Sequence, residues 1–239
     1  MRFHPLIALL LVTPLHAQAP KDHLRAGAAV VDVTPDRLPA VVNCFFPERT
    51  ANTVSDPLHA RGLVLDDGKT KLAIVIVDSC MMPRELLDRA KKLAHETTGI
   101  PVENILVAAT HTHSAPAAMG CLGSDADPAY PEFLTTRIAR CIERAHKDLA
   151  PARVGWAVTQ APEHTHNRRW ILRPDKVRTD PFGNATVRAN MHPGYQHPDF
   201  VGPSGTVDPA LTLLAVRTPE GQPVAVLANY SMHYFGSTP

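Results

Sequence analysis

Two histidines stand two residues apart in VAATHTHSAPAA, residues 107–118, directly after an apolar run. Neutral imidazole is a preferred ligand of zinc, and two rings from one strand end would form a rigid half of a metal site. Residues i and i+2 of a strand share a face, which predicts that His111 and His113 point the same way. A His-x-His pair also occurs in polar loops, where the rings satisfy backbone groups. The pair alone leaves both interpretations open.

A second apolar run ends in the same manner. Residues 224–233 read VAVLANYSMH and deliver His233 at their end. Ligands of open α/β sheets bind at the carboxyl ends of the strands, so this pattern is expected to bring His233 to the edge that carries His111 and His113. The two patterns together favour a metal site.

Two further polar positions are candidates for the same site. The segment HTHNRRW, residues 164–170, places Arg168 in a polar loop, where its guanidinium either orients a carbonyl or carboxylate group or is simply solvated. Asp78 follows the apolar run IVIV and fits either a carboxylate behind a metal-bound histidine or the N-cap of the next helix. We expect the N-cap.

The four cysteines, Cys44, Cys80, Cys121 and Cys141, show no C-x-x-C spacing, which argues against a zinc ribbon or a thioredoxin-like motif. Disulfides stay open to the chain in an oxidising compartment. Cys80 ends an apolar strand and Cys141 lies on the apolar face of a predicted helix. Both are therefore expected to be buried free thiols.

Regular elements must position the histidines, and hydrophobic periodicity predicts a series of them. Residues 58–79 are predicted to form a hairpin around an Asp-Gly turn, and its second arm, LAIVIVD, is predicted to be buried on both faces. The other predicted elements are strands at 26–35, 104–110 and 152–159, helices at 83–99 and 131–149, and a second hairpin formed by 209–218 and 224–233.

This order of elements predicts the α/β class, with a mixed β-sheet core, βαβ units and flanking helices. Residues 160–207 are rich in Pro, Gly, His and Asn and lack periodicity. We expect a long irregular loop there that helps to form the site.

The charge balance and the first residues narrow the possible partners and location. With 24 Lys and Arg against 23 Asp and Glu, the net charge of +1 offers no footprint for nucleic acid or anionic membrane. Residues 1–19 are predicted to be a signal peptide, with Arg2, an apolar stretch and the cleavage site Ala17-Gln18-Ala19. No later run is long enough to span a bilayer. Residues 20–239 are expected to be secreted or periplasmic, and their oligomeric state is unknown.

The chain resembles the neutral/alkaline, non-lysosomal ceramidases. The resemblance runs from AGAAVVDVTPD through DPLHARGLVLDDGKTKLAIVIVDSCMM and NILVAATHTHSAPAA to PVAVLANYSMH. It covers nearly all of residues 20–239, and HTHSAP after a buried strand is its most specific motif.

The resemblance implies a role for each candidate residue. It implies that His111 and His233 bind a catalytic zinc ion, that His113 lies beside the scissile amide, and that Arg168 lines the site. The family's other metal ligands, a Glu and a Tyr, and its serine lie further along the chain than this sequence extends. Residues 20–239 are therefore expected to be the N-terminal portion of a ceramidase-like hydrolase domain, truncated at its C-terminus.

The function implied by the resemblance is exported, zinc-dependent hydrolysis of a linear amide in a lipid-like substrate such as ceramide, which yields a sphingoid base and a fatty acid. Two imidazoles make a poor catalytic zinc site, so this chain alone is expected to bind zinc weakly and to be largely inactive. Two alternatives stay open. One is a non-catalytic exported metal- or ligand-binding module on the same scaffold, and the other is a related zinc hydrolase that acts on another acyl substrate.

Overall fold

A computed structural model describes residues 24–42, 47–191 and 197–232 of the chain. The predicted signal peptide lies outside these residues. None of the helices among them is long and apolar enough to cross a membrane. The elements are, in chain order, β1 (Arg25–Asp32), β2 (Ala40–Val42), β3 (Arg49–Ala51), β4 (His59–Asp66), β5 (Lys71–Val77), α1 (Arg84–Thr98), η1 (Val102–Asn104), β6 (Ile105–Ala109), α2 (Tyr130–Lys147), β7 (Ala150–Pro151), β8 (Arg153–Gln160), η2 (Pro162–His164), β9 (Trp170–Leu172), η3 (Pro174–Lys176), β10 (Ala189–Asn190), β11 (Phe200–Pro203), β12 (Ala210–Arg217) and β13 (Pro223–Tyr230).

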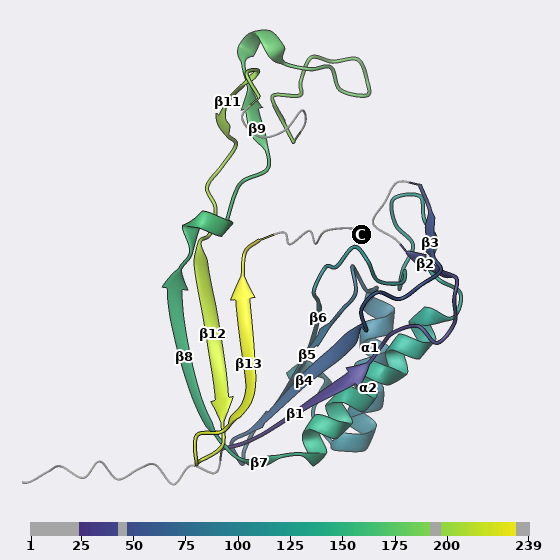
Figure 1. The fold of residues 1–239 in the computed structure, drawn as a ribbon, viewed down its shortest axis with the longest axis vertical. Coiled ribbons are helices and arrows are strands. Elements are labelled where there is room, and N and C mark those ends of the chain that lie inside the picture. The colour runs from purple at the N-terminus through teal and green to yellow at the C-terminus, as the bar shows by residue number, and fades with distance from the viewer. Residues whose placement is uncertain (1–23, 43–46, 192–196, 233–239) are drawn as a thin grey trace, which may run out of the picture.

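A mixed five-stranded sheet, in the order β6-β5-β4-β1-β7, forms the core. β5 and β6 are parallel and are joined through α1, whereas β4 pairs antiparallel with both β5 and β1. The two long helices, α1 and α2, pack on the same face of this sheet (Figure 1). The predicted α/β class with a mixed sheet is confirmed, and β5-α1-β6 is its βαβ unit.

Local sequence explains the elements on either side of β5. In the turn before it, the Asp66 carboxylate accepts a hydrogen bond of 2.8 Å from the amide of Gly68, whose φ of +85° would strain a larger residue. α1 buries a stripe of residues one turn apart against the sheet. The helix ends at Gly99, whose φ of +70° makes the left-handed C-cap that glycine favours. The predicted hairpin and helix are confirmed.

α2 lies close to β1 and β4 because glycines leave room for it. A Cβ atom at Gly62 would lie 2.8 Å from the Sγ atom of Cys141. The Cys141 thiol is fully buried and donates a hydrogen bond of 3.2 Å to the carbonyl oxygen of Ala60. Burial raises the pKa of Cys141 to about 11, so the thiol stays protonated at neutral pH. The prediction that Cys141 is a buried free thiol is confirmed.

The opposite face of the five-stranded sheet is partly exposed. Val30 on β1 is 57% exposed, Leu72 on β5 is 43% exposed and Leu106 on the edge strand β6 is 56% exposed. The prediction that β5 is buried on both faces is wrong, because its residues alternate between buried and partly exposed. The physical reason is that α1 and α2 cover the same face of the sheet.

A second sheet, antiparallel and in the order β13-β12-β8, meets the first through a small apolar cluster of Ala26, Leu63, Ala152 and Val216. The sequence predicts β8 as the next strand of the βαβ series, and this is wrong. The strand that follows α2 in the first sheet is the two-residue β7. It contains Pro151, which has no amide hydrogen with which to extend the ladder, and the chain then enters the second sheet. The predicted second hairpin is confirmed as β12 and β13.

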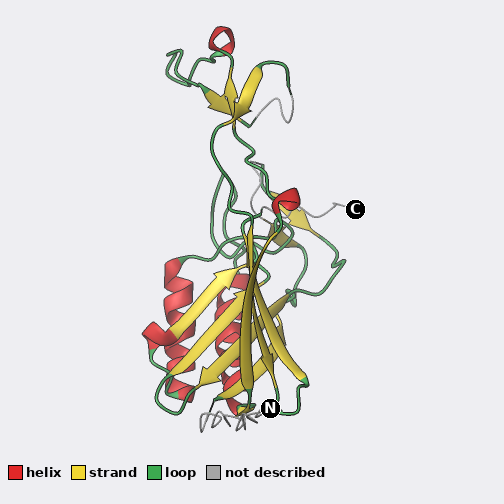
Figure 2. Ribbon diagram, turned by 90° about the vertical axis from the view of Figure 1, so that its left-hand side faces the viewer, coloured by secondary structure: helices red, strands yellow, loops and turns green. Residues whose placement is uncertain are grey.

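Residues 162–191 and 197–207 extend away from the end of the second sheet and carry a small sheet, β10-β9-β11 (Figures 1 and 2). Leu172 is buried in this unit, and the Trp170 ring stacks on Phe200 with 6.1 Å between the ring centroids. The sequence predicts an irregular loop here. The three strands are not predicted because they are two to four residues long, which is too short for hydrophobic periodicity to reveal them.

The close contact between α2 and β1 predicts that one methyl group added at Gly27 lowers the stability of the fold. A Cβ atom at Gly27 would meet the carbonyl oxygen of Ala145 and lie 2.8 Å from backbone atoms of Asp148 and Leu149. Gly27→Ala is therefore expected to lower the free energy of unfolding by about 1–3 kcal/mol, measured by urea denaturation. In the matched control Gly155→Ala, where the added methyl group meets nothing within 4 Å, the change should stay within about 0.5 kcal/mol. Equal losses in both variants would contradict the packing argument.

Candidate metal centre

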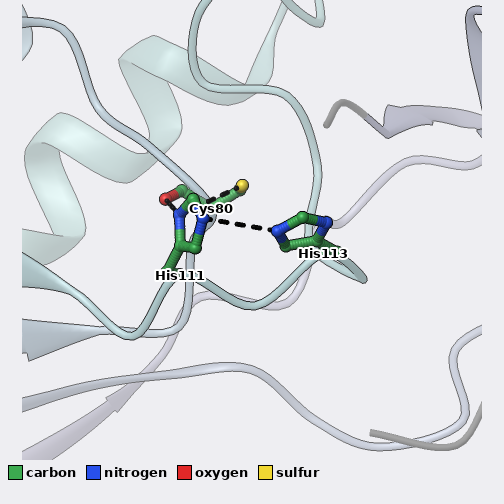
Figure 3. A group of neighbouring side chains, drawn as sticks. All are labelled: Cys80, His111 and His113. Carbon is green, nitrogen blue, oxygen red and sulfur yellow. Dashed lines mark hydrogen bonds between the residues drawn. The ribbon is translucent and has the colours of Figure 1, made fainter. Parts of the chain in front are cut away.

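The parallel pair β5 and β6 brings two loops together at the carboxyl ends of the strands. The last pair in register is Val77 with Ala109, and the amide of Thr110 still donates a hydrogen bond of 2.9 Å to the Val77 carbonyl. The chain that follows β5 therefore lies beside the chain that follows β6. Cys80 from the first loop and His111 and His113 from the second meet here (Figure 3).

The backbone of His111 explains how the two rings meet. β6 ends at Ala109, and His111 has a φ of +61°, in the left-handed region. Histidine adopts this conformation more often than most residues, at a cost on the order of 1–3 kcal/mol. The two rings do lie together, but the expectation that strand alternation aligns His111 and His113 is wrong, because both residues lie beyond the end of β6. A turn after the strand brings the rings together.

The His111 ring is held by a backbone group. Its Nδ1 atom lies 2.8 Å from the carbonyl oxygen of Cys80. A carbonyl oxygen can only accept a hydrogen bond, so Nδ1 carries the proton and, in the neutral ring, Nε2 carries the lone pair. This is the arrangement in which a second contact fixes the tautomer of a metal-ligating histidine. It makes Nε2 of His111 the ring atom that would ligate a metal ion.

The Nε2 atoms of His111 and His113 converge at 3.4 Å (Figure 3). The two rings are nearly perpendicular, at 89°, with centroids 4.9 Å apart. Two imidazole nitrogens on one tetrahedral zinc ion, each 2.0–2.1 Å from it, would be separated by about 3.3–3.4 Å. The donor set thus fits one shared ion, and it fits equally an N–H···N hydrogen bond between neutral rings. We call this pair the two-histidine claw.

Cys80 is the third member of the cluster, with its Sγ atom 3.6 Å from Nδ1 of His111. The prediction that Cys80 is a buried free thiol is wrong in part, because the residue is 2% exposed but its sulfur is in a disulfide bond. A disulfide sulfur is not a thiolate, the form that ligates metals. The sulfur also approaches the protonated nitrogen, so Cys80 contributes its carbonyl oxygen and not a third ligand. The sequence carries no signal for a backbone carbonyl in this position.

Asp78 has neither of the roles weighed for it. Its carboxylate accepts hydrogen bonds from the backbone amide of His59, at 2.9 Å, and from the Arg61 guanidinium, at 2.8 Å. The N-cap residue of α1 is Pro83, without a side-chain cap, so the predicted capping role of Asp78 is wrong. The carbonyl of Cys80 takes the position behind His111. Asp78 ties the start of β4 to the end of β5.

His233 and Arg168 stay predictions. His233 lies outside the described residues. The strand that precedes it, β13, belongs to the second sheet, and its last residue, Tyr230, donates a hydrogen bond from its hydroxyl to the carbonyl of Ala161. Arg168 is exposed between η2 and β9, and within the part of the chain that the structure describes, no hydrogen bond or ion pair joins it to the two-histidine claw.

The contact with Cys80 predicts the tautomer of His111. At a pH where the rings are neutral, ¹⁵N NMR with long-range proton correlation is expected to find the proton of His111 on Nδ1. His95, whose Nδ1 lies 2.8 Å from the carbonyl of Ile100, is a matched internal reference with the same expected tautomer. A proton on Nε2 of His111, with His95 as expected, would show that the Cys80 carbonyl does not hold the ring.

Comparisons with known proteins find ceramidases among the proteins that this chain resembles in sequence and fold. No protein-family model matches the chain. Neutral ceramidase A of Dictyostelium discoideum is 23% identical over 218 residues, which cover 87% of this chain and 28% of that protein. The crystal structure of neutral ceramidase from Pseudomonas aeruginosa superposes with a TM-score of 0.62 at 17% identity, and a ceramidase complexed with C2 superposes with a TM-score of 0.61 at 20% identity.

Each superposition covers 87% of this chain and 31% of the solved chain. The chain thus spans less than a third of the length of the proteins it matches. The resemblance and the α/β fold expected from the sequence are both confirmed. The chain is similar in sequence to a neutral ceramidase and shares its fold with solved ceramidase structures.

Proposed function

We propose that this chain is part of an exported, zinc-dependent hydrolase that cleaves a linear amide bond in a ceramide-like lipid. The observation that carries the proposal is the two-histidine claw, in which two Nε2 atoms converge at 3.4 Å beside the carboxyl end of β6. Similarity to a neutral ceramidase over 87% of the chain supports the reaction class. Because the chain spans 28% of that relative, the proposed activity is one of the whole protein.

In this proposal His111 binds the metal through Nε2, and the Cys80 carbonyl orients its ring. A bound zinc ion would supply a Lewis acid that polarises the amide carbonyl and lowers the pKa of water. His113, next to the ligand nitrogen, would hold or move a proton at the reacting amide, and Arg168 would orient the polar head of the substrate. His233 is proposed as a second ligand.

The distance between the rings favours a second arrangement within the same site. A separation of 3.4 Å also suits two ligands of one ion, which would make His113 a ligand and not a proton-transfer group. Catalytic zinc sites usually have three protein ligands and an open position. In either arrangement we propose that further ligands come from other parts of the protein.

Two other functions are compatible with the same site. A non-catalytic module would use the same claw to bind a metal or another ligand without hydrolysis. A related hydrolase would act on a different acyl substrate, because fold and metal do not choose the leaving group. The proposed export is supported by the signal-peptide pattern of residues 1–19 and by the disulfide at Cys80, since disulfides persist in oxidising compartments.

The claw predicts weak but specific zinc binding by the described chain. Competition titration with a chromogenic chelator is expected to find one zinc ion per chain, and His111→Ala should weaken binding on the order of tenfold or more. His164→Ala is the matched control, because this exposed histidine neighbours Glu163 and not the claw, and its zinc affinity should not change. A loss in His113→Ala as large as that in His111→Ala would make both residues ligands. Equal affinity in all variants would contradict a metal centre here.

Amide hydrolysis tests the reaction itself. Residues 20–239 are expected to hydrolyse N-acylsphingosine no faster than their His111→Ala variant, because two ligands hold zinc poorly. A protein extended to the length of its relatives is expected to release fatty acid and to lose this activity on chelation. Turnover by residues 20–239 that depends on His111 would contradict the need for further ligands. No turnover of ceramide, short N-acyl amides or esters by the extended protein would favour the non-catalytic module.

A further inference from the structure

We infer that Cys80 is a positioning residue for His111. Its carbonyl oxygen fixes the ring tautomer, and its disulfide holds that carbonyl in place, so that loss of the disulfide weakens metal binding by the two-histidine claw. The inference rests on the proposed function in one respect, the role of His111 as a metal ligand. In this role the Cys80 sulfur does not touch the metal ion and acts only by holding the backbone in place.

The first step is the contact itself. Nδ1 of His111 lies 2.8 Å from the Cys80 carbonyl oxygen and 3.6 Å from the Cys80 sulfur. Oxygen is the stronger acceptor, and its distance is that of a normal N–H···O hydrogen bond. The ring is therefore oriented by main chain. Small movements of this carbonyl would turn the ring and displace Nε2, the atom that faces His113.

The second step is that His111 cannot hold this geometry from its own backbone. Its φ of +61° is a strained conformation that persists where surrounding structure determines it. The His111 side chain is exposed, so burial in the core does not hold its ring. The hydrogen bond to the Cys80 carbonyl is one described contact that sets the direction of the ring.

The third step concerns what holds Cys80. The residue lies in the turn between β5 and α1, beyond the last ladder pair of β5. The neighbouring Ser79 is fully buried, and its amide and hydroxyl bond to the carbonyls of Val77 and Met81, at 2.8 and 3.2 Å. These contacts fix one side of the turn. The disulfide of Cys80 adds a covalent tie at the residue whose carbonyl faces His111.

The test separates the disulfide from the carbonyl. Cys80→Ala keeps the backbone carbonyl and removes the disulfide. The double variant Cys44→Ala/Cys80→Ala also removes Cys44, the remaining cysteine besides the free Cys121 and Cys141, so that no new thiol competes for metal. In both variants zinc affinity is expected to fall about tenfold, as is typical when a group behind a metal-bound histidine is disturbed. The ¹⁵N signals of His111 should shift toward a mixture of tautomers, while those of His95 stay unchanged.

A control separates positioning from general loss of stability. Gly27→Ala strains the contact between α2 and β1, far along the sheet from the claw, and should leave both the zinc affinity and the His111 signals of the folded protein as they are. Unchanged His111 signals and zinc affinity in the Cys80 variants would overturn the inference. Changed signals in a chain that binds no zinc would uphold the positioning role and contradict the proposed function.

The remaining outcome of the test is that the Cys80 sulfur itself binds the metal ion. Titration with Co²⁺ reports it, because a thiolate ligand gives a sulfur-to-metal charge-transfer band. Cys44→Ala, which substitutes the cysteine left besides the free Cys121 and Cys141, is expected to produce no such band and to weaken binding as Cys80→Ala does. A band with tighter binding in Cys44→Ala, absent from the double variant, would show that Cys80 is a ligand once its sulfur is free, and would overturn the positioning role.

Discussion

The parallel pairing of β5 with β6 is the interaction on which the candidate site depends. A parallel pair requires a crossover, here α1, and both strands bury one face against the helices, where Val75 and Val77 are fully enclosed. Their common direction places the loop with Cys80 beside the loop with His111 and His113. An antiparallel β6 would send these loops to opposite ends of the sheet. The sequence separation of 31 residues between Cys80 and His111 is bridged by this register and not by local structure.

Much of the fold follows from periodicity and turn chemistry because these signals are local. Asp66 and Gly68 mark the hairpin, and Gly99 marks the end of α1, each through hydrogen bonds or dihedral angles within a few residues. The choice of partner strand is not local. β8 has the pattern of a strand whichever sheet it joins, and Pro151 shows its effect on the ladder only once β1 is known to be its neighbour. The exposed face of β5 could not be predicted for the same reason, because an apolar run does not show which side of the strand a helix covers.

The candidate site likewise has a part that the sequence reveals and a part that depends on tertiary structure. The residue types and spacing identify His111 and His113, because imidazole chemistry is visible in the sequence. Their arrangement is not visible, since it depends on a left-handed residue at position 111 and on a carbonyl from another loop. The disulfide at Cys80 escapes because a cysteine after an apolar strand looks alike whether its sulfur is free or bonded. Side chains that carry chemistry can be found from sequence, whereas the backbone groups that orient them depend on tertiary pairing.

The described residues include protein groups that orient the claw. The determinants of its orientation are a strand pair, a backbone carbonyl and a strained dihedral angle, all fixed by a core that includes Val75, Val77 and α1. Small zinc domains differ, because their ligands come together only when the metal binds and binding energy is folding energy. A strain on the order of 1–3 kcal/mol at His111 is instead balanced by burial elsewhere in the domain. The fold therefore supplies direction, while affinity depends on how many ligands complete the ion. Two well-oriented imidazoles are a precise but incomplete half of such a site.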